Sequence, residues 1–228
     1  MQDPEIVTGK VKPVECFKEG WELIKDEYWM LFAVTLVGAL IGGITMYILF
    51  GAMICGIFFV YLRKIDGGRV VFDDLWKGFN WWLPGLVVTL FIVVPMFAVY
   101  LILYLPFLMA LVMGSNLSQD ELFGLLAGAA VLDLVVIVVM VCVHTLLMFS
   151  FPLIVDRGLG AIGAMRTSAR AVLKNLAGVA GLLALNFGIV MLGQLALCVG
   201  VYFVIPIVVA GNVVAYRKIF PRLNLAGY

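Results

Sequence analysis

Residues 28–62 read YWMLFAVTLVGALIGGITMYILFGAMICGIFFVYL and contain no charged side chain. The hydrocarbon core of a bilayer is about 30 Å thick and is crossed by about 20 helical residues. A run of 35 apolar residues is too long for one ordinary span. It therefore predicts a hairpin of two transmembrane helices with a tight turn near Gly42 and Gly43.

Three further apolar runs follow, at 81–113, 122–155 and 175–216. The polar sequence GSNLSQDE separates the first two runs, and we expect the third to divide near Gly193. Together with the first hairpin, these runs predict six transmembrane helices arranged as three hairpins. Eight spans is the alternative, if either of the two long middle runs folds back on itself.

The composition agrees with a membrane protein. Hydrophobic residues make up 64% of the 228 residues, charged residues make up 13%, and the mean hydropathy is +1.15. Soluble domains are about 45–50% apolar and about 25% charged. A soluble chain of this composition would expose more contiguous apolar surface than soluble monomers tolerate.

The basic residues predict the orientation. All 15 lysines and arginines lie in four segments, at 1–27, 63–80, 156–174 and 217–228. Six spans place these four segments on one side of the membrane, and the positive-inside rule makes that side the cytoplasm. We expect no signal peptide, because the first 27 residues are polar.

Each predicted hairpin follows a segment with an apolar stripe at helical spacing. Such a helix lies at the membrane surface, with its stripe in the headgroup region and its charges in water. The three stripes are Val14, Phe17, Trp21, Ile24 and Tyr28; then Phe72, Leu75, Trp76 and Phe79; and then Ile162, Met165, Ala169, Val172 and Leu176.

The predicted architecture is therefore an all-α polytopic membrane helical bundle, in which an interfacial amphipathic helix precedes each of three hairpins. We expect one integral membrane domain over 1–228. Its three units cover 13–62, 72–155 and 161–220, and residues 1–12 form a flexible cytoplasmic tail.

The chain also resembles a known group of membrane proteins. The likeness is carried by FKEGWELIKDEYW (17–29), YLRKIDGG (61–68), FDDLWKGF (72–79), FPLIVDRGLGAIGAMRTSARAVLKN (151–175) and IPIVVAGNVVAYRKIF (205–220). On these segments it is similar to uncharacterised six-pass bacterial membrane proteins, which are related to the membrane domain of some glycerophosphoryl diester phosphodiesterases. The resemblance implies a six-helix fold in the bacterial inner membrane and implies no activity, because the phosphodiesterase barrel is a separate soluble domain.

Little in the sequence predicts catalysis. The chain has one histidine, His144, and its four cysteines form no CxxC pair, so we expect no metal site and no cofactor. Phosphate-binding and nucleophile motifs are absent from the sequence. We therefore predict that the protein is not an enzyme.

Polar residues inside the apolar runs are candidates for function. Asp133 and His144 are eleven residues apart, which places them on nearly the same face of a helix. Asp133 either faces the bundle interior and marks an ion or proton path, or lies at the outer interface, and we favour the second reading. Asn186, Gln194 and Asn212 are predicted to form hydrogen bonds between helices.

Prolines and small residues predict features of packing. Pro84, Pro95 and Pro106 recur every eleven residues, and we expect kinks at Pro95 and Pro106 with this face turned into the bundle. Fourfold spacing of small residues permits close helix packing, within one chain or between copies. These residues are Gly38 and Gly42, Gly124 and Gly128, and Ala180, Ala184 and Gly188.

The third amphipathic segment is basic. Arg166, Arg170 and Lys174 recur every four residues, and Arg157 lies shortly before them. Basic residues near an anionic leaflet contribute about 1 kcal/mol each to membrane binding. This stripe either binds anionic lipid headgroups, which we favour, or docks against the acidic segment at 15–27.

These observations favour a non-enzymatic membrane protein that organises lipid or partner proteins, as a membrane-organising or accessory subunit. The alternative is a transporter or channel for a small or amphipathic solute, suggested by the prolines and by Asp133. Expected partners are membrane lipids and either a partner protein or a second copy of the chain, without nucleic acid.

Overall fold

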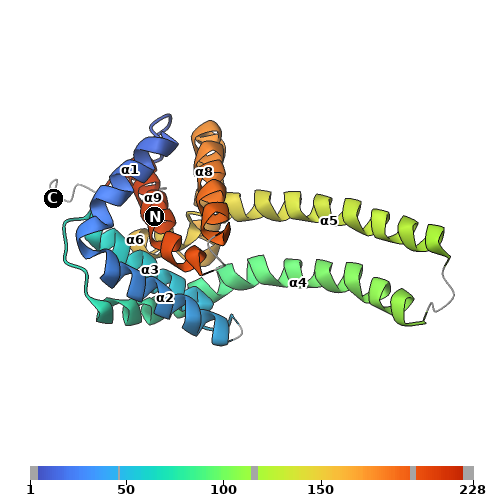
Figure 1. Cartoon of the computed structure of the whole chain (residues 1–228). Helices are drawn as coiled ribbons and strands as arrows, with labels where there is room; N and C mark the ends of the chain where they lie inside the picture. Colours follow the sequence, from blue (N-terminus) through green and yellow to red (C-terminus); the bar gives the residue numbers. More distant parts are fainter. Residues whose placement is uncertain (1–4, 46, 114–117, 196–198, 223–228) are drawn as a thin grey trace. The chain divides into compact units, whose positions relative to one another are not determined.

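The computed structural model describes residues 5–45, 47–113, 118–195 and 199–222, and for several residues between 102 and 122 it describes the backbone alone. Over these ranges the chain is helical and has no strand, which confirms the all-α class. Figure 1 shows the elements. They are α1 (Pro13–Ile24), η1 (Lys25–Glu27), α2 (Tyr28–Ile44), α3 (Phe50–Ile65), η2 (Phe72–Trp81), α4 (Trp82–Met113), α5 (Gln119–Leu147), α6 (Ser150–Arg157), α7 (Ala161–Lys174), α8 (Leu176–Leu195) and α9 (Gly200–Ile219).

Five helical stretches of the described chain are long and apolar enough to cross a membrane. They run Pro13–Ile44, Phe72–Leu101, Gln119–Arg157, Leu176–Leu195 and Gly200–Ile219. The second helix of the first predicted hairpin is α3, which has 16 residues. At about 1.5 Å per residue it is roughly 24 Å long, shorter than the usual hydrocarbon thickness. A sixth span therefore stays a prediction.

The chain forms two compact units. Unit 1 consists of 1–89 together with 146–228, and unit 2 consists of 90–145. The division differs from the three units predicted from the hairpins. Unit 1 combines the first and third predicted units with both ends of the second, and unit 2 holds the long middle of the second.

Helix α9 lies at the centre of unit 1 and contacts α1, α2, α3 and α8. Large side chains that are fully buried hold this centre together, among them Tyr61, Phe149, Tyr216 and Phe220. The rings of Phe149 and Tyr216 are 6.2 Å apart, and those of Tyr216 and Phe220 are 5.1 Å apart. The apolar character of α9 thus serves packing within the protein as well as burial in lipid.

Glycines set the closest helix contacts of unit 1. A Cβ at Gly20 of α1 would lie 2.9 Å from the backbone nitrogen of Gly211 of α9. A Cβ at Gly38 of α2 would lie 2.9 Å from Ile57 Cδ1 of α3. The predicted packing role of Gly38 is therefore confirmed. At Gly124 and Gly188, in two other predicted stripes, an added Cβ would meet nothing within 4 Å.

Val7 and Gly9 are bonded to the rest of unit 1, although the sequence predicted a flexible tail over 1–12, of which residues 1–4 lie outside the described structure. The backbone amide of Val7 donates to the carbonyl of Ile219 (3.0 Å), and that of Gly9 donates to Asn175 Oδ1 (2.9 Å). The Asn175 amide in turn donates to the Val7 carbonyl (3.2 Å). One buried asparagine side chain thus supplies the partners that a free tail would take from water.

Helix α1 contacts the protein through small residues and through only part of its predicted apolar stripe. Cys16, Gly20 and Ile24 are buried, whereas Val14 and Trp21 are exposed. The small side chains allow α1 to approach α9 closely. Two apolar residues of the predicted stripe are consequently left on the surface, beside the charged residues.

The segment before α4 forms a 3₁₀ helix, η2, with three residues per turn. This period aligns Phe72, Leu75, Gly78 and Trp81 on one face, of which Leu75 and Gly78 are buried against α3. The rings of Trp76 and Phe79 stack on each other at 6.3 Å and are exposed. As in α1, large apolar residues of the predicted stripe point away from the protein.

Unit 2 consists of the long parts of α4 and α5. Tyr104 Oη donates to Asp133 Oδ2 (2.8 Å) and links the two helices. In the most apolar stretch of α5 no residue is buried. Helix α4 continues through Pro95 and Pro106, so the predicted kinks stay predictions. Pro95 is exposed, and the side chain of Pro106 lies outside the described part of the structure.

Candidate lipid-binding surface and charge cluster

Helix α7 is held by its small and polar residues. Gly158, after the end of α6, has a φ of 62°, a left-handed conformation that glycine adopts readily and that ends helices. The chain then turns into α7, where Ala164, Ser168 and Ala171 are buried. Ser168 Oγ accepts from the amide of Phe149 (3.1 Å) and donates to the carbonyl of Leu146 (2.7 Å). These bonds fix which face of α7 points outward.

The outward face of α7 combines basic and apolar residues. Arg166, Arg170 and Lys174 are all exposed. Ile162 and Leu173 on the same side of the helix are 60% and 63% exposed. The predicted apolar stripe is therefore split, because Val172 and Met165 are buried in the protein whereas Ile162 and Leu176 remain outside. An exposed face with adjacent apolar and basic rows is the pattern of interfacial helices.

Arg157 does not belong to this face. Its side chain is only 8% exposed, lies 2.9 Å from Asp156 Oδ2 through Nε, and donates to the carbonyl of Pro221. The sequence grouped it with the α7 residues because of its position in the chain. The structure instead turns it towards the end of α9, where it neutralises a carboxylate.

Three acidic residues of the first segment form ion pairs outside α7. Glu19 of α1 accepts from Lys218 of α9 (2.8 Å), and Glu27 lies 3.2 Å from Lys64 of α3. Glu22 pairs with Lys25 of the neighbouring turn. Docking of the acidic helix against the basic stripe stays a prediction.

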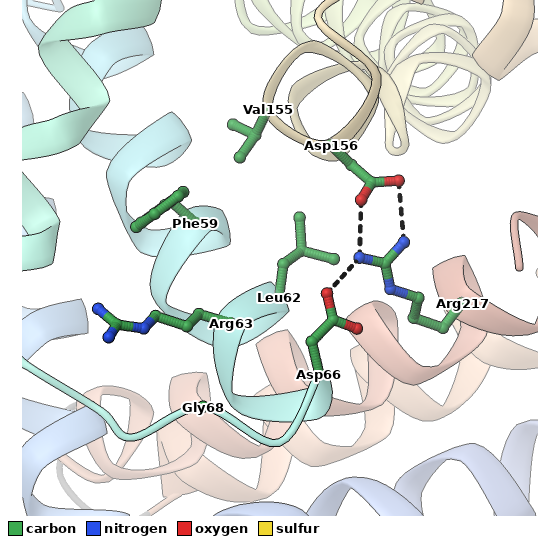
Figure 2. Close-up of a pocket in the computed structure, with 8 residues that line it drawn as sticks. All are labelled: Phe59, Leu62, Arg63, Asp66, Gly68, Val155, Asp156 and Arg217. Atoms are coloured by element: carbon green, nitrogen blue, oxygen red, sulfur yellow. Dashed lines mark hydrogen bonds and ion pairs between the residues drawn. The ribbon is translucent and has the colours of Figure 1, made fainter. Parts of the chain in front are cut away.

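A charge cluster joins the ends of α3, α6 and α9 (Figure 2). Arg217 donates to both oxygens of Asp156 (2.9 and 2.7 Å) and to Asp66 Oδ2 (2.8 Å). Arg222 donates to the other oxygen of Asp66 (2.6 Å), and Tyr216 donates to Asp156 (2.7 Å). Hydrogen bonds between charged groups in such forked geometry are among the strongest in proteins.

The cluster was not predicted as a unit. Its charged residues follow the ends of apolar runs, in YLRKIDGG, in LIVDRG and in YRKIFPR. The basic residues of the cluster were used only to predict the orientation in the membrane. The acidic residues beside them, Asp66 and Asp156, were the signal that could have predicted ion pairs between helix ends. Pairing them requires knowing which helix ends meet, and a pattern along the chain does not carry that information.

The four basic segments meet in unit 1. Asp66, Asp156 and Arg217 bring three of them together, and the pair Glu19–Lys218 adds the first. Asn175 also contacts the N-terminal segment through Gly9. This contact between the segments is what a common side of the membrane requires.

Other predicted polar residues lie apart from this cluster. Asn186 Nδ2 of α8 donates to Asn212 Oδ1 of α9 (3.0 Å), a bond between helices of the predicted kind. Asp133 is half-buried beside Tyr104, and His144 is exposed on α5. Within the described residues no group of three His, Cys, Asp or Glu side chains could hold a metal ion. The role of Asp133 in an ion path stays a prediction.

Comparison with models of known protein families, with curated proteins and with solved structures finds no significant match. The resemblance to the six-pass bacterial proteins therefore stays an expectation from the sequence. What can be inferred about function comes from the geometry of the surface and the cluster.

Proposed function

We propose that this chain is a multi-pass membrane protein that works without catalysing a reaction, by binding anionic lipids at the membrane surface through α7. The observation that carries the proposal is the outward face of this helix. Arg166, Arg170 and Lys174 are exposed there beside exposed Ile162 and Leu173. A soluble protein would gain nothing from leaving these apolar side chains uncovered.

The energetics favour lipid as the partner. Burial of apolar surface stabilises by about 25 cal/mol per Å², so the exposed leucine and isoleucine would gain by entering the acyl boundary. Each basic residue at an anionic surface adds about 1 kcal/mol. Because the opposite face of α7 is fixed by Ser168, the helix presents both groups without having to rearrange.

The same proposal includes six crossings with the four basic segments in the cytoplasm. Contact among those segments supports an even number of crossings between each pair of them. The short α3 would then cross where the bilayer thins or where its basic end, Arg63 and Lys64, extends to the headgroups. A bacterial inner membrane location rests on the resemblance and on the positive-inside rule.

Transport, the alternative function, has weaker support. The Tyr104–Asp133 hydrogen bond gives the carboxylate a partner within unit 2. That bond satisfies the group without requiring a path for ions. Lipid binding therefore explains more of the exposed chemistry.

Lipid selectivity of the reconstituted full chain tests the proposal. The double variant Arg166→Gln/Lys174→Gln should lower the association of spin-labelled phosphatidylglycerol, relative to phosphatidylcholine, by at least about fivefold. Electron paramagnetic resonance of the motionally restricted lipid measures this ratio. In 1 M salt, where the Debye length is about 3 Å, the preference of the unmodified protein should largely disappear.

The matched control is Lys10→Gln/Lys18→Gln, which removes the same charge from exposed positions of the N-terminal segment. It should keep the preference for phosphatidylglycerol. An unchanged preference in the α7 variant, or an equal loss in the control, would refute a site on α7.

A further inference from the structure

A cavity lies in unit 1 beside the charge cluster. It is bounded by α3 and the loop that follows it, by the end of α6 and by α9, and its volume is about 440 Å³. Cavities that bind small molecules commonly measure about 300–1,000 Å³. The space is therefore large enough for a small ligand, and its position at the ends of three helices places it at the level of the predicted cytoplasmic interface.

The lining has an apolar part and a polar part, both visible in Figure 2. Phe59, Leu62 and Val155 form the apolar part. The polar residues lie at two places. The side chains of Asp156, Arg217 and Asp66 are joined to one another, whereas the Arg63 side chain extends away from them (Figure 2). The lining thus offers an apolar surface next to Arg63.

The carboxylates of the lining are already neutralised. Both oxygens of Asp66 accept from arginines, as do both oxygens of Asp156 from Arg217. A cationic ligand would have to displace these charge-assisted bonds. The chemistry of the lining therefore favours an anion over a cation.

The positive charge that is not neutralised lies beside Arg63. Asp74 is shared by Arg63 and by Lys77, whose Nζ also lies 5.1 Å from the ring centroid of Phe59. Among the residues that line the cavity, Arg63 and Arg217 equal Asp66 and Asp156 in number, and both carboxylates are paired with Arg217. An anion at Arg63 would balance the charge that Asp74 alone does not.

One side chain of the lining has donors that a ligand can reach. Arg63 contacts Asp74 through Nη1, and its side chain is 40% exposed, so its other donors remain available. The Nη groups of Arg217 donate to Asp156 and Asp66, and its Nε is buried, so Arg217 neutralises the carboxylates of the lining.

We propose that this cavity binds a phosphate group at Arg63, beside the apolar surface formed by Phe59, Leu62 and Val155. Arginine recognises phosphate through paired donors. The phosphate belongs either to the headgroup of a membrane lipid or to a free phosphate in the cytoplasm. The site uses none of the residues of the α7 face, so either proposal can fail without the other.

Binding to the full chain in an uncharged detergent tests the site. With the α7 face disabled by Arg166→Gln/Lys174→Gln, isothermal titration with dihexanoyl phosphatidic acid should show saturable binding of one ligand per chain, and neutral dihexanoyl phosphatidylcholine should bind at least about tenfold more weakly. Inorganic phosphate separates the two sources. Tighter binding of phosphatidic acid assigns a lipid headgroup, and equal binding assigns a free phosphate, so both results support the phosphate site.

Arg63→Gln should weaken binding of phosphatidic acid about fivefold, the effect of one charge near the ligand, and Arg63→Lys should retain most of the affinity. Lys10→Gln, at an exposed position of the N-terminal segment outside the cavity, is the control and should leave this affinity unchanged. Val155→Phe keeps every charge and fills the cavity, so it should weaken binding even where Arg63→Gln alters folding. Unfolding midpoints of the variants identify any that are destabilised.

Three results would overturn the site. They are a folded protein that binds neither phosphatidic acid nor inorganic phosphate, equal affinity with and without Arg63→Gln in the same α7 variant, and full affinity in Val155→Phe. Equal binding of phosphatidylcholine and phosphatidic acid would also refute the role of charge.

Discussion

Arg217 connects more of the molecule than any other residue of the charge cluster. Its guanidinium makes three hydrogen bonds, to Asp156 at the end of α6 and to Asp66 just after α3. Its side chain is 12% exposed. Both acceptors are partly buried carboxylates. Removing the arginine therefore leaves two negative charges with fewer partners in a partly buried site, which costs more than the loss of the contacts alone.

At the scale of the residue, Arg217→Gln should destabilise the protein by about 3 kcal/mol, because breaking a buried ion pair costs about 3–5 kcal/mol and this one is partly accessible. Arg217→Lys should recover only part of the loss, because lysine restores the positive charge but lacks the planar guanidinium that donates to two carboxylates at once. Unfolding in mixed detergent micelles, followed by circular dichroism, measures the difference.

Arg222→Gln is the matched control at this scale. Arg222 pairs with the same Asp66, but its side chain is 54% exposed. Exposed ion pairs contribute about 0–1 kcal/mol, so this variant should lose less than about 1 kcal/mol. Equal losses in the two variants would show that Arg217 does not join the helix ends as described.

At the scale of the element, the surface helices share one arrangement. Each buries small residues together with some larger ones against the protein, and leaves other large apolar side chains exposed. Gly20 faces α9 while Trp21 is outside, Gly78 faces α3 while Trp76 is outside, and Ala171 is buried while Leu173 is outside. An element built in this way is attached to the protein on one side and offers its apolar surface to another phase.

The contact of α1 with α9 provides the test at this scale. Gly20→Ala places a Cβ 2.9 Å from the backbone of Gly211, and backbone cannot move aside as a flexible side chain can. We expect a loss of about 1–3 kcal/mol, typical of overpacking. Hydrogen exchange should show faster exchange of the α1 amides.

Gly188→Ala in α8 is the control for this substitution, because an added Cβ there meets nothing within 4 Å. Alanine is favoured over glycine in a helix by about 0.5–1 kcal/mol, so this variant should be neutral or stabilised. Unchanged protection of α1 in Gly20→Ala would contradict the close contact of the two helices.

At the scale of the whole molecule, the four basic segments are in contact with one another within unit 1. They were predicted to share a side because all 15 basic residues lie in them. The structure brings them into contact through Asp66, Asp156 and Glu19. The contacts support a common side, and the prediction that this side is the cytoplasm requires an experiment on cells.

Thiol labelling in intact bacterial cells provides that experiment. With the natural cysteines replaced by serine, Gly163→Cys on α7 should react with a membrane-impermeant maleimide only after the cells are permeabilised. Ser118→Cys, before α5, should react in intact cells. Both positions are exposed, so differences in labelling report the side of the membrane. Labelling of Gly163→Cys in intact cells would refute the predicted orientation.

The sequence was sufficient for features that depend on local pattern. Long uncharged runs can satisfy their backbone groups in lipid only as helices, so the all-α class followed from residues 28–62 and the runs like them. The turn in the first run was predicted near Gly42 and Gly43, and it lies between α2, which ends at Ile44, and α3, which starts at Phe50. The exposed basic residues Arg166, Arg170 and Lys174 also followed from spacing alone.

The tertiary structure decided which face of each element is covered and which charged residues meet. Apolar residues are equally suited to a protein interior and to lipid, so hydrophobicity could not show that Val172 is buried while Ile162 is exposed. Nor could it show that Asp66 and Asp156 converge on Arg217. Those pairs lie 151 and 61 residues apart in the chain, and only the packing of α3, α6 and α9 brings their ends together.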